Sequence, residues 1–186
     1  MEYVEGRTLR QVIDTDAPLP VDHVLDYIEQ ICKGLSYSHN QGIYHLNLNP
    51  EHLMLADDGF VKIMDFGIAA TIHTTMARMT GTLPAEMIPY LSPEQIQGKP
   101  NIDGRSDIYS LGIVFYEMLS GQPPFVGEHV NDQHINESPQ PIDQMLPEIN
   151  YILQKCLGKK ADDRYAHIDE LRKALLDVKL VTNFNN

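Results

Sequence analysis

Histidine is the first residue type in this chain whose chemistry needs an account. The sequence contains eight histidines, and two of them, His45 and His52, lie close together in one short segment. Imidazole binds metal ions and exchanges protons near neutral pH. However, the eight histidines form no HExxH pair and no cluster with cysteine, which are the spacings typical of zinc sites. We therefore expect no structural metal ion.

The segment around these two histidines is one of a series of short motifs. In chain order, the motifs cover residues 44–55, 65–67, 90–94, 106–112, 121–125 and 162–165. Together they resemble the catalytic loop, the DFG motif and the later conserved blocks of protein kinases. The sequences of these motifs are most similar to those of bacterial serine/threonine kinases of eukaryotic type. Because six blocks occur in the right order, the resemblance is highly specific, and it covers residues 1 to about 178.

The resemblance implies one lobe of a two-lobe fold. Residues 1–6 resemble the hinge between the kinase lobes, so the chain is predicted to begin at the hinge and to lack the N-terminal lobe (N-lobe). In the family, that lobe carries a glycine-rich phosphate loop and a lysine-bearing strand. We predict a kinase-like C-terminal lobe (C-lobe) over residues 1–180 and a frayed tail over residues 181–186.

The segment that resembles the catalytic loop differs from the family at the reactive positions. The resemblance assigns Asn47 to the position of the general-base Asp, Asn49 to the catalytic Lys and His52 to a metal-binding Asn. An amide cannot act as a base near pH 7, and imidazole poorly replaces the oxygen ligands that Mg²⁺ prefers. Asp65, at the metal-binding Asp of the family, is expected to brace the next loop or to be a weak metal ligand. Since removing a general base or an electrostatic stabiliser typically costs about 10²–10⁴ in rate each, and the N-lobe is predicted to be absent, we expect no phosphotransferase activity.

Other matching positions carry structural roles in the family. The resemblance implies a buried ion pair between Glu94 and Arg164. It also implies that Asp107 braces the backbone of the catalytic loop through hydrogen bonds. His45 and Phe66 match two members of an apolar spine that continues into the N-lobe. These framework residues match the family where the reactive residues do not.

The elements that must position these residues are predicted to be mainly helical. Apolar residues recur at helical spacing or cover most sides of each candidate helix. Helices are predicted over residues 8–14, 21–40, 106–120, 147–157 and 168–178. Short apolar runs at 43–44, 53–55 and 60–64 predict small hairpins, with a turn at Asp57-Asp58-Gly59. Residues 71–90 predict a long loop, and the fold class is a kinase-like helical bundle with small β-hairpins.

Composition and charge narrow the functional classes. The 186 residues, 42% of them hydrophobic, suit one globular domain, and no apolar run is long enough to span a bilayer. The net charge of −12 argues against nucleic acid and membrane as partners. Residues 1–60 hold ten acidic and three basic residues. This excess of negative charge forms either a solvated surface or a surface that attracts a basic partner. Cys32 and Cys156 predict two buried thiols in a reducing cytoplasm.

Three functional hypotheses fit the sequence. The first is a catalytically inactive pseudokinase, a regulatory module without cofactor or ATP binding. It would bind a protein partner or a second copy through the face that an N-lobe normally covers, which includes Met1, Met54, Leu55 and Phe66. The alternative is a fragment of a longer serine/threonine protein kinase, whose ATP-binding N-lobe lies upstream or is supplied in trans. The third is a decaying gene product, against which the intact framework argues.

Overall fold

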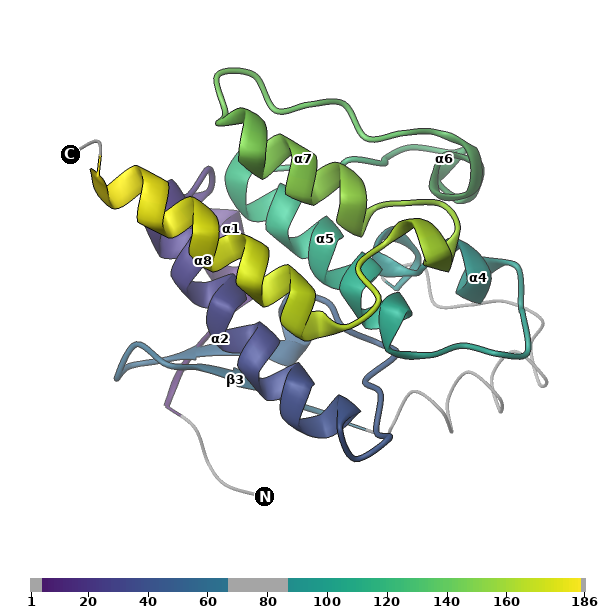
Figure 1. The fold of residues 1–186 in the computed structure, drawn as a ribbon, viewed down its shortest axis with the longest axis horizontal. Coiled ribbons are helices and arrows are strands. Elements are labelled where there is room, and N and C mark those ends of the chain that lie inside the picture. The colour runs from purple at the N-terminus through teal and green to yellow at the C-terminus, as the bar shows by residue number, and fades with distance from the viewer. Residues whose placement is uncertain (1–4, 67–86, 185–186) are drawn as a thin grey trace.

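A computed structural model of the chain describes residues 5–66 and 87–184 (Figure 1). Its α-helices are α1 (Leu9–Asp16), α2 (Val21–His39), α4 (Pro93–Ile96), α5 (Gly104–Ser120), α6 (Val130–Asn136), α7 (Pro147–Cys156) and α8 (Ile168–Phe184). Short 3-10 helices are η1 (Pro50–His52), η2 (Ile88–Tyr90) and η3 (Ala161–Asp163). The strands are β1 (Gly6–Thr8), β2 (Leu53–Ala56) and β3 (Val61–Ile63). The prediction of a mainly helical fold with a small β component is confirmed.

Helix α5 lies at the centre of the bundle because its side chains are apolar on most sides. It packs against α2 and α7, and α8 contacts all three of these helices (Figure 1). The Asp103 side chain caps the start of α5 by accepting a hydrogen bond from the backbone N–H of Arg105. Gly121 ends the helix in the left-handed conformation, with φ 82°. Most of the apolar core is therefore arranged around one nearly fully buried helix.

Helices α5 and α7 approach each other closely at Gly112. A Cβ atom at Gly112 would lie 2.7 Å from the Cβ of Cys156 on α7, so no larger residue fits there without a shift. Cys156 and Cys32, which lies on α2, are buried free cysteines. Burial raises the pKa of the Cys32 thiol well above its usual range and that of Cys156 to about 12. The prediction of two buried thiols is confirmed.

The three strands form one antiparallel sheet in the order β1-β2-β3. The predicted turn joins β2 to β3, and Gly59 takes the left-handed conformation there, with φ 83°. The backbone N–H of Ala56 donates to the carbonyl of Phe60 at 2.9 Å, which closes the hairpin. The sheet lies against α1 and α2, and the ends of β2 and β3 opposite the turn reach the motif residues.

Some elements differ from the predictions. Strand β1 was not predicted, because its three residues show no pattern of their own and pair only when β2 is present. The run 43–44 forms no strand. Helix α8 continues to Phe184, into the predicted tail, because each added residue extends an existing helix at little cost. Most of the predicted loop 71–90, like Met1 and Gly67, lies outside the described residues.

One further finding concerns membranes. Within residues 5–66 and 87–184, no helix combines the length and apolar character that crossing a bilayer requires.

Candidate functional site

The β2–β3 hairpin brings His52 and Asp65 together. Leu53 pairs with Ile63 at the open end of the hairpin, so the residues just before β2 and just after β3 face each other. The backbone N–H of Met64 donates to the carbonyl of His52 at 2.9 Å. As a result, Nε2 of His52 lies 3.9 Å from Oδ2 of Asp65. Two motif residues thirteen positions apart thus share one site.

The backbone of the preceding loop is held by Asp107 on α5. This fully buried carboxylate accepts hydrogen bonds from the N–H of His45 at 2.8 Å and from the N–H of Leu46 at 2.7 Å. It also accepts one from Nε2 of His39 at 2.8 Å. Leu46 has φ 59°, a conformation that is uncommon outside glycine and costs energy for a leucine. The buried Asp107 therefore helps to hold a strained loop in place.

The carbonyl oxygen of Asn47 connects the rest of the loop. Nδ1 of His52 lies 2.8 Å from this oxygen, and Nδ2 of Asn49 donates to it at 3.2 Å. The side-chain oxygen of Asn49 accepts from the N–H of Glu51 at 2.9 Å and so caps η1. Asn49 and His52 thus fix the backbone of the loop. The Asn47 side chain is half-buried, and it makes no hydrogen bond with any residue that the structure describes.

The ring of His45 is used entirely within the structure. Its Nε2 donates to the carbonyl of Met64 at 2.8 Å, and its Nδ1 accepts from the N–H of Asn47 at 3.3 Å. Burial lowers the pKa of this imidazole, which favours the neutral form. The ring packs edge-on against Phe66, with 4.9 Å between ring centroids. His45 therefore joins the loop to the segment after β3, and its role in an apolar spine stays a prediction.

Asp65 is the carboxylate of the site with access to solvent. Its side chain is 43% exposed, and its backbone has φ 61°. A non-glycine residue in this conformation is typical of sites where local strain serves a function. In the parts of the chain that the structure describes, no group of three or more His, Cys, Asp or Glu side chains could hold a metal ion. The role of Asp65 as a weak metal ligand stays a prediction.

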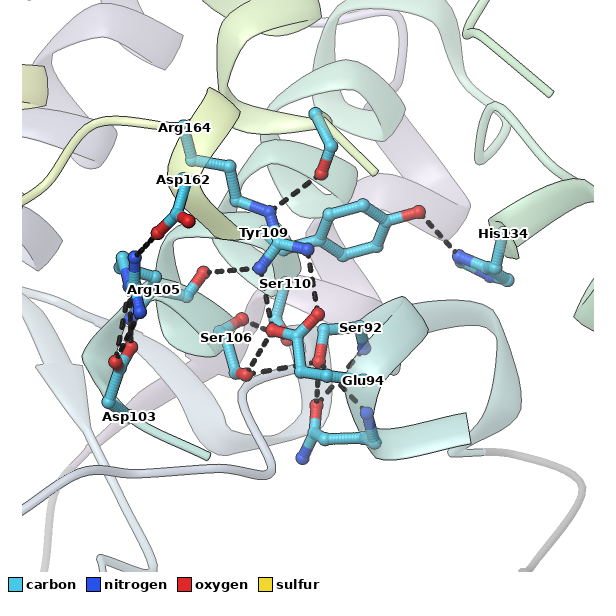
Figure 2. Close-up of polar contacts among 12 residues, drawn as sticks. Ser92, Glu94, Asp103, Arg105, Ser106, Tyr109, Ser110, His134, Asp162 and Arg164 are labelled. Carbon is cyan, nitrogen blue, oxygen red and sulfur yellow. Dashed lines mark hydrogen bonds and ion pairs between the residues drawn. The ribbon is translucent and has the colours of Figure 1, made fainter. Parts of the chain in front are cut away.

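The ion pair between Glu94 and Arg164 lies in a second polar cluster (Figure 2). Arg164 donates from Nη1 to Oε1 of Glu94 at 2.7 Å and from Nη2 to Oε2 at 2.8 Å. Ser106 on α5 donates to the same carboxylate at 2.5 Å. Burial alone would raise the pKa of Glu94, but the hydrogen bonds and charge of Arg164 lower it to about 2. The pair links α4 to the segment before α8.

This cluster extends to α6 through aromatic contacts. The Arg164 guanidinium lies 4.7 Å from the ring centroid of Tyr109, whose hydroxyl is 2.8 Å from Nδ1 of His134 (Figure 2). Burial lowers the pKa of His134 to about 4. Lys159 donates to the carbonyl of His134 at 2.8 Å, and burial lowers the pKa of Lys159 to about 8. The contacts of this cluster connect α4, α5, α6 and η3.

The predicted interaction face is less exposed than expected. Met54, Leu55 and Phe66 are each half-buried, and Leu55 and Phe66 pack against the core. The sheet and the His45 ring partly cover these three side chains, and their role as an interaction face stays a prediction. A large exposed side chain lies instead at the tip of the hairpin, where Phe60 is 62% exposed.

Sequence reasoning missed two side chains that hold the loop. Nε2 of Gln95 donates to the carbonyl of Leu46 at 2.8 Å, and Gln95 also completes a capping box with Ser92 at the start of α4. The spacing Ser-x-x-Gln is the signal that could have identified this residue. His39, which donates to Asp107, lies at the end of α2 and has no comparable signal.

Comparison with known proteins gives these motifs a family context. The model of the protein kinase domain matches residues 1–176. The serine/threonine-protein kinase PknB of Mycolicibacterium smegmatis is 40% identical over 186 residues, or 96% of this chain and 30% of the relative. PknB of Mycobacterium leprae is 39% identical over 190 residues, with the same shares. A probable serine/threonine-protein kinase of Streptomyces coelicolor is 41% identical over 180 residues, or 92% of this chain and 27% of the relative. The chain spans less than a third of the length of these relatives.

The prediction that this chain is not an enzyme is wrong. The matched family is enzymatic, and the relatives are named as serine/threonine protein kinases. The prediction rested on the expected absence of the N-lobe and on Asn47, Asn49 and His52. Phosphoryl transfer depends mainly on positioning and on electrostatic stabilisation by the whole site, so three changed side chains do not establish inactivity.

Proposed function

Because this chain belongs to the protein kinase domain family, we propose that it forms the C-lobe of a serine/threonine protein kinase. The ATP site of that kinase is completed by an N-lobe, either upstream in the same polypeptide or on a separate chain. The observation that carries this proposal is the match to the kinase domain over residues 1–176, together with the kinase names of the relatives. The share of those relatives that the chain spans, about 30%, is consistent with a part of a larger enzyme.

In this proposal Asn47 positions the hydroxyl group that accepts the phosphoryl group. An amide oxygen accepts a hydrogen bond from a hydroxyl but does not remove its proton at neutral pH. Because the transition state of phosphoryl transfer is loose, orientation of the acceptor contributes even without a strong base. The half-buried side chain of Asn47, on a backbone fixed by His52 and Asn49, suits this role.

The magnesium ion that the family uses fits this site only in part. Bound Mg²⁺ neutralises charge on the transferring phosphates and orients them. The Asp65 carboxylate offers the hard oxygen ligand that Mg²⁺ prefers. His52 offers a nitrogen ligand at the second position that the resemblance assigns to the metal, and this does not suit Mg²⁺.

We further propose that the face around Met54, Leu55 and Phe66 is the docking surface for the N-lobe. These side chains remain half-buried and lie beside the candidate site. Light scattering of the chain with a separately purified N-lobe should give a one-to-one complex. A homodimer of the chain that excludes the N-lobe would contradict this assignment and favour the pairing of two copies.

A fusion protein tests the proposed function. We would join an N-lobe, taken from the Mycolicibacterium smegmatis relative, to residue 1 and measure phosphoryl transfer from ATP to serine and threonine residues of a generic protein substrate. We expect transfer by the fusion, and its loss in the Asp65→Asn variant. The chain alone should show no thermal shift with ATP. A fusion that is folded and shifts with ATP, but transfers nothing at any metal ion tested, would refute the proposal.

A further inference from the structure

A groove between α7 and α8 lies apart from both the candidate site and the face proposed for the N-lobe. The two helices pack side by side and run in opposite directions (Figure 1). The groove has a volume of about 430 Å³, and the buried side chains of Ile152, Tyr165 and Val178 line it. We propose that this groove docks a basic amphipathic helix of a partner protein. The proposal goes beyond the proposed function, because it requires neither an N-lobe nor phosphoryl transfer.

Large apolar side chains remain exposed along the same two helices. Tyr151 lines the groove on α7 and is 64% exposed. Leu146, at the N-cap of α7, and Leu180, on α8, are also exposed. Together with Leu176 on α8, they make up four of the eight exposed large apolar residues in the described part of the chain. Exposed apolar side chains that gather on neighbouring elements are typical of interaction sites, where tyrosine often contributes much of the binding energy.

The charges at the groove select a basic partner. Glu148 on α7 and Asp177 on α8 line it, one from each helix, and both residues are exposed. Neither carboxylate has an ion-pair partner among the residues that the structure describes. The nearby Lys155 is engaged elsewhere, since its ammonium lies 4.2 Å from the ring centroid of Tyr165. Two unpaired carboxylates beside an apolar floor complement a surface that presents basic side chains next to apolar ones.

The walls of the groove favour a helix as the occupant. Within α7 and α8 the backbone groups bond along each helix, so an extended peptide gains no backbone hydrogen bonds from them. A helical partner satisfies its own backbone and can place apolar residues at positions i, i+3, i+4 and i+7 into the groove. A second copy of the chain is a poorer occupant, because both copies would carry a net charge of −12 and the same two carboxylates.

Fluorescence anisotropy of the full chain with three labelled helical peptides tests the proposal. The first peptide carries leucine at positions i, i+3, i+4 and i+7 and lysine on its opposite face. The second replaces each lysine by glutamate, and the third replaces each leucine by serine. We expect the first peptide to bind at least ~10-fold tighter than either of the others. Equal binding of the first and second peptides, or no binding of the first, would overturn the proposal.

Two tyrosine variants locate the binding on the surface. Tyr151→Ala should weaken binding of the first peptide by about 10-fold. Tyr37→Ala, the same truncation at an exposed tyrosine on α2, should leave its affinity within about twofold. Because both side chains are largely exposed, neither truncation should unfold the chain. Equal weakening by the two variants would overturn the assignment to the groove.

Two double variants separate the groove from general attraction to an acidic protein. Glu148→Gln with Asp177→Asn should weaken binding of the first peptide by about fivefold. Asp22→Asn with Asp132→Asn removes the same charge at exposed positions outside the groove and should leave the affinity within about twofold. Equal weakening by both would overturn the proposal. Self-association of the wild type that is lost in Tyr151→Ala would also overturn it and would assign the groove to a second copy. None of these outcomes affects the fusion assay.

Discussion

The cluster around Glu94 and the loop around Asn47 use polar side chains in opposite ways. In the cluster, the Arg164 side chain is fully buried and meets a carboxylate seventy residues away in the chain. In the loop, Asn49 and His52 bond to backbone atoms two to five residues away, and His52 is partly exposed. The cluster joins distant segments, whereas the hydrogen bonds of Asn49 and His52 lie within their own segment. Substitutions should therefore affect stability most in the cluster and chemistry most in the loop.

The largest expected effect on stability is the loss of Arg164. Arg164→Met leaves the Glu94 carboxylate buried without its partner, and breaking a buried pair in this way typically costs about 3–5 kcal/mol. The free energy of unfolding in urea measures this cost. Arg105→Met, which removes the more exposed pairs with Asp103 and Asp162, serves as the control and should cost no more than about 1 kcal/mol. Equal losses of unfolding free energy in the two variants would show that burial does not make the Arg164 pair stronger than the pairs of Arg105.

The second prediction concerns acid. The pKa of Glu94 falls from 4.5 to about 2 on folding, so its stabilising contribution is complete above about pH 4.5 and is lost as pH falls toward 2. The full contribution is roughly 3 kcal/mol. We expect the difference in unfolding free energy between the wild type and Glu94→Gln to narrow over this range. A difference that stays constant from pH 7 to pH 3 would contradict the assignment.

The third prediction moves to the loop and to activity. In the fusion protein, Asn47→Asp supplies a base at the acceptor position and should raise the rate of phosphoryl transfer by about 10²-fold or more. The change in stability should be small, because Asn47 uses its backbone, not its side chain, to hold the loop. Asn40→Asp, at the exposed end of α2, is the matched control. An unchanged rate would mean that orientation by the amide already suffices.

The smallest expected effect comes from the turn of the hairpin. Gly59 has φ 83° and open space around the position of a Cβ atom, so Gly59→Ala introduces backbone strain without a clash. We expect a loss of about 1 kcal/mol in unfolding free energy. Gly59→Asn should lose less, since asparagine tolerates this conformation better. The reverse order would show that side-chain contacts, and not the backbone, govern this turn.

Much of the fold could be predicted from local patterns. The stripe of apolar residues over 21–40 and the run over 106–120 identified α2 and α5, and Asp57-Asp58-Gly59 identified the hairpin turn. Strand β1 could not be found, because its pairing depends on β2, far away in the sequence. Similarly, residues 43–44 look like a strand, but the loop that follows them is held by hydrogen bonds to Asp107 on α5.

The candidate site was predicted only as a set of positions. The resemblance located the positions of Asn47, His52 and Asp65. It described Asn47 and His52 only as replacements of the family's residues, and Asp65 as a residue that is retained. The use of the Asn47 carbonyl as a common acceptor depends on backbone geometry that no residue type reports. The approach of His52 to Asp65 depends on the register of the hairpin. Residue identity also misled the prediction of activity, which the named relatives overturned.

The two cysteines in the core give a way to observe how often the helical bundle opens. A thiol reacts with an alkylating reagent only when it is both accessible and deprotonated. Burial shields Cys32 and Cys156 from the reagent and raises the pKa of each thiol, so both stay protonated. The rate of alkylation of the native chain would therefore report how often α2 or α7 separates from α5. Docking of another lobe near β2 and β3 would slow this reaction only if it stabilises the whole bundle. The chain thus carries two internal reporters of how far the effect of such docking reaches.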